Sequence, residues 1–136
     1  KLAYKEALNE AYPDRSKWGK QPRSGASCDV FVGTVMRASG ADPNFPRGLD
    51  EVENHIAKNS KKYKVINNPT QEEMEPGDII YELYKGGGGH ISIFLKEHRI
   101  AQAQYNGKTY PHVQKYEKQI KDSHKKFCVY RRKNNG

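Results

Sequence analysis

The feature of this sequence that most constrains its fold is a change in hydrophobic periodicity near residue 76. Upstream of it, apolar side chains recur at the spacing of amphipathic helices, over residues 2–12, 28–39 and 49–58. A short strand is predicted at residues 63–66. Downstream of the turn signal Pro76-Gly77, four segments are rich in β-branched and aromatic residues and indicate strands: 78–84, 91–96, 99–105 and 127–131. Helices followed by strands predict an α+β fold, with N-terminal helices packed on an antiparallel sheet.

The length of the chain bounds its organisation. A chain of 136 residues corresponds to one domain and can bury a core without disulfides or metals. We therefore expect residues 1–136 to form a single domain that acts as a monomer. The chain begins at Lys1 inside a helical pattern, which leads us to expect that it is part of a longer secreted protein. No signal peptide and no apolar run of transmembrane length is visible in it.

The charge balance is basic, with 24 Lys and Arg residues against 16 Asp and Glu residues. A net charge of +8 attracts polyanions such as nucleic acids, anionic membranes or the anionic polymers of a bacterial wall. The other interpretation is that the lysines only keep the protein soluble. The sequence contains neither the basic–aromatic motif of an RNA-binding domain nor a recognition-helix signature, so nucleic acid is not an expected partner.

The two cysteines, Cys28 and Cys128, occupy different environments. One disulfide is arithmetically possible. However, Cys128 lies in the strand pattern Phe127-Cys128-Val129-Tyr130, which predicts a buried, inert thiol. We therefore expect Cys28 to be free. No Cys/His spacing matches a zinc site, and we expect neither a metal nor a cofactor.

Cys28 follows a Gly/Ser-rich loop at the start of the second predicted helix. Unpaired N–H groups at a helix start lower the pKa of a thiol, and an adjacent imidazolium does the same. His90, at the start of a predicted strand, is the candidate for that second group. Glu97-His98 predicts a hairpin turn, so the next strand would bring Gln102 near the start of the His90 strand, where its amide oxygen could orient the imidazole. These residues predict a cysteine nucleophile.

Each of these residues also has an ordinary interpretation. A lone cysteine in an apolar helix is usually core, and a lone histidine at a strand start is usually surface. The glycine run 86–89 is either a flexible loop that lets a bulky substrate approach or a plain hairpin connection. The order of the elements favours catalysis: a cysteine at a helix start, then a Pro-Gly-Asp strand, then a Gly-His strand.

The same elements resemble the NlpC-type papain-like cell-wall peptidases and their CHAP amidase/peptidase relatives. The matching segments are Ser27-Cys28-Asp29-Val30, Gly77-Asp78-Ile79-Ile80, Gly89-His90-Ile91-Ser92-Ile93-Phe94 and Ala101-Gln102-Ala103. The resemblance spans residues 18–105 and implies a papain-like fold. It also implies that Cys28 attacks an amide carbonyl, that His90 is the base and then the acid, and that Gln102 orients His90 in the place of a histidine.

The resemblance also identifies candidate substrate-binding residues. Where the family has Asp before its nucleophile and Ser after it, this chain has Ser27 and Asp29. Asp29 either grips a substrate ammonium group or is an ordinary acid in the first helical turn. An upstream tyrosine commonly lines the family's site, and Tyr12 and Trp18 are both candidates for that position. Gly89, beside His90, completes this set.

The substrate implied by the resemblance is the peptide stem of peptidoglycan, cut after γ-D-glutamate as in NlpC-type members. Alternatives are a CHAP-like cut at the muramoyl–alanine amide or in a cross-bridge, a papain-like hydrolase or transferase acting on protein or lipid amides, and a non-catalytic wall-binding module. We expect a secreted or wall-associated protein of a Gram-positive bacterium, phage or mobile element. Anionic wall polymers would be a second partner of its basic surface.

Overall fold

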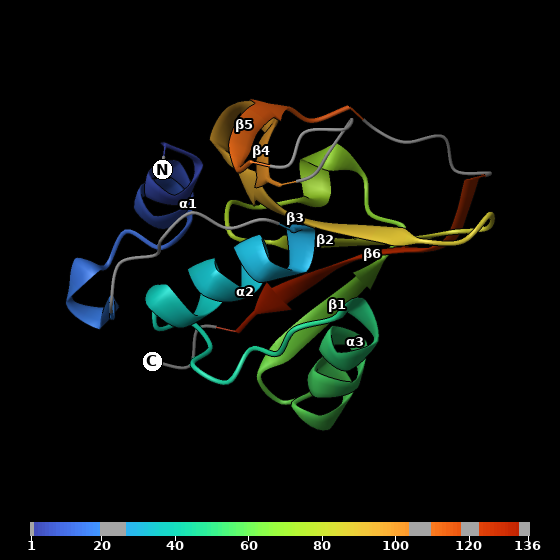
Figure 1. Ribbon diagram of the computed structural model, residues 1–136, viewed down its shortest axis with the longest axis horizontal. Helices are drawn as coiled ribbons and strands as arrows, with labels where there is room; N and C mark the ends of the chain where they lie inside the picture. Colours follow the sequence, from blue (N-terminus) through green and yellow to red (C-terminus); the bar gives the residue numbers. More distant parts are fainter. Residues whose placement is uncertain (1, 20–26, 104–109, 118–122, 134–136) are drawn as a thin grey trace.

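The computed structural model describes residues 2–19, 27–103, 110–117 and 123–133. Three helices, α1 (Leu2–Ala11), α2 (Cys28–Ala38) and α3 (Leu49–Lys58), pack against one face of a six-stranded sheet (Figure 1). α1 ends before Pro13, as predicted. α2 ends at Ala38, one residue short of the predicted range, and Gly40 follows with a positive φ of 76° that favours glycine. None of the helices in the described ranges is long and apolar enough to cross a membrane.

The sheet is antiparallel throughout, in the order β1-β6-β2-β3-β4-β5. Its strands are β1 (Tyr63–Asn67), β2 (Ile79–Tyr84), β3 (Gly89–Leu95), β4 (Arg99–Gln102), β5 (His112–Lys115) and β6 (His124–Arg132). The predicted α+β class is therefore confirmed. The strand predicted at residues 99–105 ends at Gln102, and residues 104 and 105 lie outside the described ranges.

Two features of the sheet were not predicted. β5 carries a single apolar side chain, Val113, and becomes a strand through its backbone pairing with β4. β6 begins at His124, three residues before the predicted start, because its polar first residues pair with the end of β2. In both places a neighbouring strand, rather than hydrophobic alternation, determines the strand bounds.

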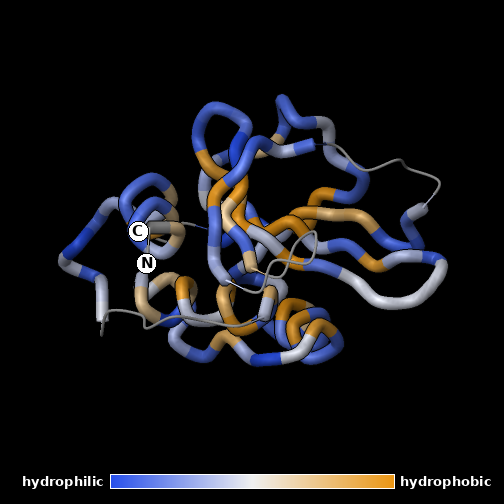
Figure 2. The backbone as a smooth tube through the Cα atoms, turned by 45° about the horizontal axis from the view of Figure 1, so that its top comes forward, coloured by the Kyte–Doolittle hydropathy of each residue, from blue (hydrophilic) through white to orange (hydrophobic). Residues whose placement is uncertain are grey.

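The sheet buries side chains on both of its faces. Side chains of one parity pack under the helices: Ile79, Tyr81, Ile91, Ile93, Leu95, Ala101, Cys128 and Tyr130. Those of the other parity form a second cluster on the opposite face: Ile80, Phe94, Ile100, Phe127 and Val129, joined by Met74 and Tyr116. Hydrophobic segments accordingly concentrate in the strands and hydrophilic ones in the connections (Figure 2). This double coverage explains why these strands are apolar without strict alternation.

Asp78, at the start of the Pro-Gly-Asp strand, has a structural role. Its carboxylate is 1% exposed and accepts two hydrogen bonds from Arg131, from Nε at 2.8 Å and from Nη2 at 2.7 Å. The backbone N–H of Glu75 donates a third. A buried carboxylate is tolerated when its charge is paired in this way, so Asp78 anchors the turn before β2 to β6.

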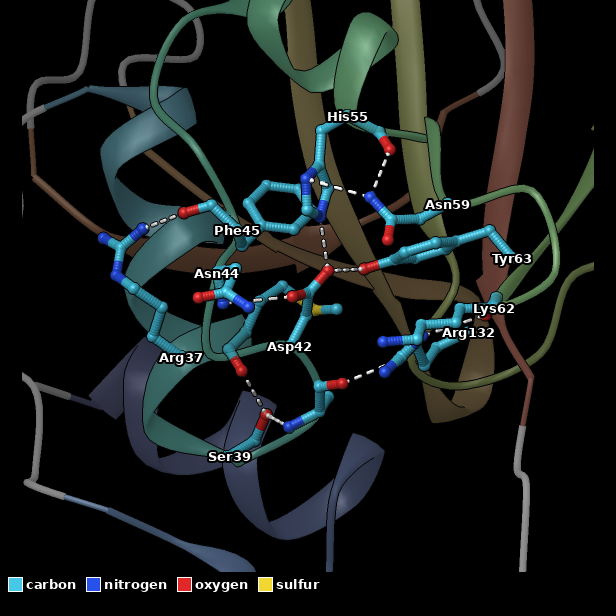
Figure 3. Close-up of polar contacts among 12 residues, drawn as sticks. Arg37, Ser39, Asp42, Asn44, Phe45, His55, Asn59, Lys62, Tyr63 and Arg132 are labelled. Carbon is cyan, nitrogen blue, oxygen red and sulfur yellow. Dashed lines mark hydrogen bonds and ion pairs between the residues drawn. The ribbon is translucent and has the colours of Figure 1, made fainter. Parts of the chain in front are cut away.

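A second buried carboxylate lies just beyond the C-terminal end of α2. Asp42 Oδ2 accepts a hydrogen bond from Tyr63 Oη at 2.6 Å and lies 2.7 Å from His55 Nε2, while Oδ1 accepts from the Asn44 N–H (Figure 3). Arg132 stacks over the Tyr63 ring. We call Asp42, His55 and Tyr63 the Asp42 cluster; it ties the loop after α2 to α3 and β1.

Candidate active site

Cys28 is the first residue of α2, and its half-buried thiol lies against the backbone of β3. Ser27 precedes it in an extended conformation (φ −125°), which turns the chain into the helix. The thiol accepts a hydrogen bond from the N–H of Ile91, the residue that follows His90. The β3–β4 ladder runs only over Ile93–Leu95, so Ile91 lies beyond it and remains accessible to the helix start.

His90 and Gln102 form the predicted pair. His90 is 8% exposed and Gln102 is fully buried, and His90 Nε2 lies 2.6 Å from Gln102 Oε1. Ile93 pairs with Ala101, so Gln102 is opposite Ser92 and meets His90 diagonally. Because an amide oxygen only accepts, His90 must donate from Nε2, and Nδ1 is then the basic nitrogen of the neutral ring.

A further histidine extends this pair on β5. Gln102 Nε2 lies 3.3 Å from His112 Nε2, and His112 Nδ1 lies 3.2 Å from the carbonyl oxygen of Tyr110. His112 Nε2 also lies 2.9 Å from Gln114 Oε1, which is the shorter of its two contacts. Because an amide oxygen only accepts, Nε2 donates to Gln114. β5 therefore places His112 beside the buried amide of Gln102.

Burial dominates the ionisation of both reactive groups. It raises the pKa of the Cys28 thiol, Asp29 adds to the rise, and the N–H groups near the sulfur offset it only in part. It lowers the pKa of His90, against the opposing effects of Gln102 and of the Glu82 carboxylate. Both directions favour the neutral thiol and the neutral imidazole, rather than the ion pair expected from the sequence.

The residues that flank Cys28 are held by contacts within the protein. Ser27 Oγ donates to Asp29 Oδ1 at 2.9 Å, and the N–H of Gly48 donates to Asp29 Oδ2 at 2.8 Å. Burial alone would raise the pKa of Asp29, but these hydrogen bonds outweigh it and the pKa is lowered. Asp29 thus joins the start of α2 to the loop before α3.

The glycine run forms the hairpin between β2 and β3. Gly87 and Gly88 have φ angles of 101° and 76°, and Tyr84 pairs with both through its backbone. Gly89 is needed for a different reason. A Cβ there would lie 2.5 Å from the Glu82 carbonyl oxygen and 2.8 Å from Leu49 Cδ1. The start of β3 therefore packs closely against α3.

Tyr12 and Trp18 contact the other end of α2. Tyr12 Oη donates to Met36 Sδ and the Gly77 carbonyl, and Trp18 Nε1 donates to the Tyr12 carbonyl at 2.7 Å. Met36 lies eight residues after Cys28, about 12 Å along the helix. No described contact brings either aromatic side chain to Cys28, so their role in substrate binding stays a prediction.

Besides His112, two titratable residues near His90 were missed from the sequence. Glu82, on β2, is the direct cross-strand partner of His90 and is 4% exposed. His124, on β6, places Nε2 2.9 Å from Glu82 Oε2. The signal for Glu82 was its charge within the apolar run of β2, whereas His124 gave none, since its role depends on strand order. In the part of the chain that the structure describes, no group of three or more His, Cys, Asp or Glu side chains could hold a metal ion.

Comparison with known proteins gives a structural match only. No family model and no curated protein sequence matches the chain. Nine chains of solved structures match, among them the peptidoglycan hydrolase RipB from Mycobacterium tuberculosis. The RipB match has a TM-score of 0.54 and 15% sequence identity, and covers 94% of this chain and 64% of the RipB chain. The chain thus has the NlpC-type fold predicted from its sequence.

Proposed function

We propose that this protein is a cysteine peptidase that hydrolyses an amide bond in the peptide stem of peptidoglycan. The observation that carries the proposal is the 2.6 Å contact of His90 with Gln102, next to Ile91, whose backbone N–H faces the Cys28 thiol at the start of α2. The shared fold with a peptidoglycan hydrolase supports the substrate class. Within that class we propose the bond between γ-D-glutamate and the diamino acid.

In the first half of the proposed reaction, Cys28 Sγ attacks the carbonyl carbon. His90 Nδ1 takes the thiol proton, which suits the neutral resting pair that burial favours. The N–H of Cys28 at the helix start stabilises the oxyanion that forms. The imidazolium then gives its proton to the leaving amine, the C–N bond breaks, and a thioester remains on Cys28.

In the second half, water replaces the amine. His90 takes a proton from the water as it attacks the thioester carbonyl, and the C–S bond breaks. The new stem carboxyl group leaves, and the proton returns to Cys28. Gln102 accepts from Nε2 throughout, so that Nδ1 stays directed at the reacting atoms.

The remaining parts of the proposal concern context. A net charge of +8 would hold the protein on an anionic wall. We propose that the protein is secreted and wall-associated, and that this chain is a monomeric hydrolase domain of it. The chain spans less than two thirds of the RipB chain. Asp29, Ser27 and Gly89 line the approach to Cys28 in this proposal.

Digestion of purified Gram-positive sacculi tests the proposal. The wild type and Cys28→Ala are compared, with Cys128→Ala as the matched control because Cys128 is fully buried. Soluble muropeptides should appear with the wild type and the control but not with Cys28→Ala. Their masses identify the cut bond and separate the stem endopeptidase from the muramoyl–alanine amidase and the cross-bridge enzyme. Absence of products on several wall types would contradict the proposal.

Thiol reactivity distinguishes an enzyme from a wall-binding module. Iodoacetamide should alkylate the half-buried Cys28 at the helix start much faster than the fully buried Cys128. The two rates can be followed by peptide mass spectrometry. Equal, slow modification of both cysteines would instead favour a module that binds without cutting.

A further inference from the structure

A buried carboxylate faces His90 from the strand opposite Gln102. Glu82 pairs with His90 in the β2–β3 register, so the two side chains lie on the same face of the sheet. Directly opposed residues in an antiparallel pair have Cβ atoms about 5 Å apart. Both side chains are almost fully buried, at 4% and 8% exposure. The charge on Glu82 therefore acts on His90 with little screening by water.

Glu82 is held in place by two neighbours. His124 Nε2 lies 2.9 Å from Oε2, and Tyr84 Oη donates to the same oxygen at 3.4 Å. His124 stacks against the rings of Tyr84 and Phe127, with interplanar angles of 24° and 15°. These contacts fix the carboxylate on the His90 side of the sheet.

The bond to His124 holds the carboxylate from β6. Because a carboxylate oxygen accepts, His124 donates from Nε2 to Glu82 Oε2. Its Nδ1 is buried and has no hydrogen-bond partner among the described residues. The position of Glu82 beside His90 is therefore fixed by a contact that crosses from β2 to β6.

Resting on the proposed function, we propose that Glu82, held by His124, is a positioning residue that stabilises the imidazolium formed on His90 in each half of the reaction. Gln102 orients the ring but carries no charge. In this arrangement the two tasks that one carboxylate performs in many triads are divided between β4 and β2.

The other charged or titratable groups around His90 do not replace Glu82. β4 contributes the neutral Gln102, and α2 contributes Cys28 with Asp29 behind it. His112 on β5 lowers the pKa of His90, whereas Glu82 raises it. The hydrogen bond from His90 to Gln102 raises that pKa more than Glu82 does, but Gln102 carries no charge, so Glu82 is the anionic group whose removal should disfavour the imidazolium.

NMR titration of the His90 ring in the resting protein tests this inference without any substrate. In Glu82→Gln the titration midpoint should fall by about one pH unit relative to wild type. Glu53→Gln is the matched control, because Glu53 also contacts a tyrosine hydroxyl, that of Tyr81, and a basic residue of β6, Lys126. Its midpoint should equal the wild-type value. An unchanged midpoint in Glu82→Gln would overturn the inference.

Two further variants keep the test decisive. If Glu82→Gln does not fold, Glu82→Gln/His124→Gln restores a neutral hydrogen-bonded pair and should show the same fall. Glu82→Asp keeps the charge and should restore the wild-type midpoint at least in part. A double variant that titrates like wild type would contradict the proposal.

Kinetics on sacculi separate this inference from the function on which it rests. In Glu82→Gln, kcat should fall about tenfold with KM nearly unchanged, and the acid limb should move to lower pH. An inactive wild type would overturn the proposed function and the catalytic role of Glu82 with it. An active wild type whose kcat and acid limb are unchanged in Glu82→Gln would overturn the inference alone.

Discussion

The two ends of α2 each lead to a histidine, half-buried His55 at one end and buried His90 at the other, and the two have different partners. Beyond the C-terminal end, His55 contacts a carboxylate, Asp42, that Tyr63 and the Asn44 backbone also bind. At the N-terminal end, near Cys28, His90 contacts a neutral amide, Gln102. A search for a histidine paired with an acid would select His55 and, on β6, His124, but not His90. The comparison teaches that a nearby nucleophile, and not a carboxylate partner, distinguishes the catalytic candidate.

Substituting each of the two histidines, His90 and His55, should have the largest effect and tests their different roles most directly. His90→Ala should lower kcat on sacculi by about a thousandfold or more, because the proton acceptor is lost. His55→Ala should lower the free energy of unfolding while the folded fraction keeps its activity. Muropeptide release and urea denaturation measure the two effects. Comparable loss of activity in both variants would mean that the assignment of the two ends is wrong.

Removing the carboxylate of the Asp42 cluster should have the next largest effect. Asp42→Asn leaves the Tyr63 hydroxyl and His55 without their shared anion, and we expect a cost of about 3 kcal/mol in the free energy of unfolding. Asp14→Asn is the control, because Asp14 is exposed and bonds only within its own turn. Urea denaturation should leave that control at the wild-type midpoint. A stable Asp42→Asn would show that the cluster does not hold α3 to β1.

Gln102→Ala should have a smaller effect than His90→Ala. The ring loses its acceptor at Nε2 but keeps the basic Nδ1, so we expect kcat to fall by about tenfold to a hundredfold. Gln102→Glu restores an acceptor and should recover part of the rate. The hydrolysis rate of a soluble stem peptide can be compared for His90→Ala, Gln102→Ala and Gln102→Glu. Losses as large in Gln102→Ala as in His90→Ala would contradict a purely orienting role.

The pH dependence of activity and of stability should also differ between the two ends of α2. Burial lowers the pKa of His90, so its neutral, active form should persist below about pH 6.5 and the acid limb of kcat/KM should lie under that value. As the pH drops below about 6.5, the unfolded chain takes up a proton on His90 before the folded chain does. The free energy of unfolding therefore also falls in this range. Because burial raises the pKa of Cys28, the alkaline limb should lie above pH 9. A profile of kcat/KM whose acid limb lies well above pH 6.5 and whose alkaline limb lies well below pH 9 would instead favour a resting ion pair between Cys28 and His90.

The Asp42 cluster should respond at lower pH. Burial alone would raise the pKa of Asp42, but hydrogen bonds from Tyr63 and His55 outweigh it and the pKa is lowered. Its stabilisation is therefore complete above the unfolded value of about 4 and is lost as pH falls through the folded value. As the pH falls, activity should thus be lost before the stabilisation by the Asp42 cluster is lost. Denaturation midpoints measured between pH 3 and 7 check the order of the two losses.

Local patterns were enough to predict the helices, most strands and the contact between His90 and Gln102. Helix periodicity, the hairpin turn and the position of each residue in its element depend only on near neighbours in the sequence. The Glu82–His124 pair was not predictable in this way, because 42 residues separate its members and only the β2–β6 pairing brings them together. The charge states of Cys28 and His90 were also inaccessible, since they depend on burial, which favours the neutral form of each group.

The position of β6 has a consequence for biosynthesis. Residues 124–132 lie between β1 and β2, so during translation β1 has no partner strand and β2 keeps an open edge until this late segment emerges. The nascent chain can form the β2–β3 hairpin early but cannot complete its sheet. Under the function proposed above, a delay of this kind would suit export as an unfolded polypeptide.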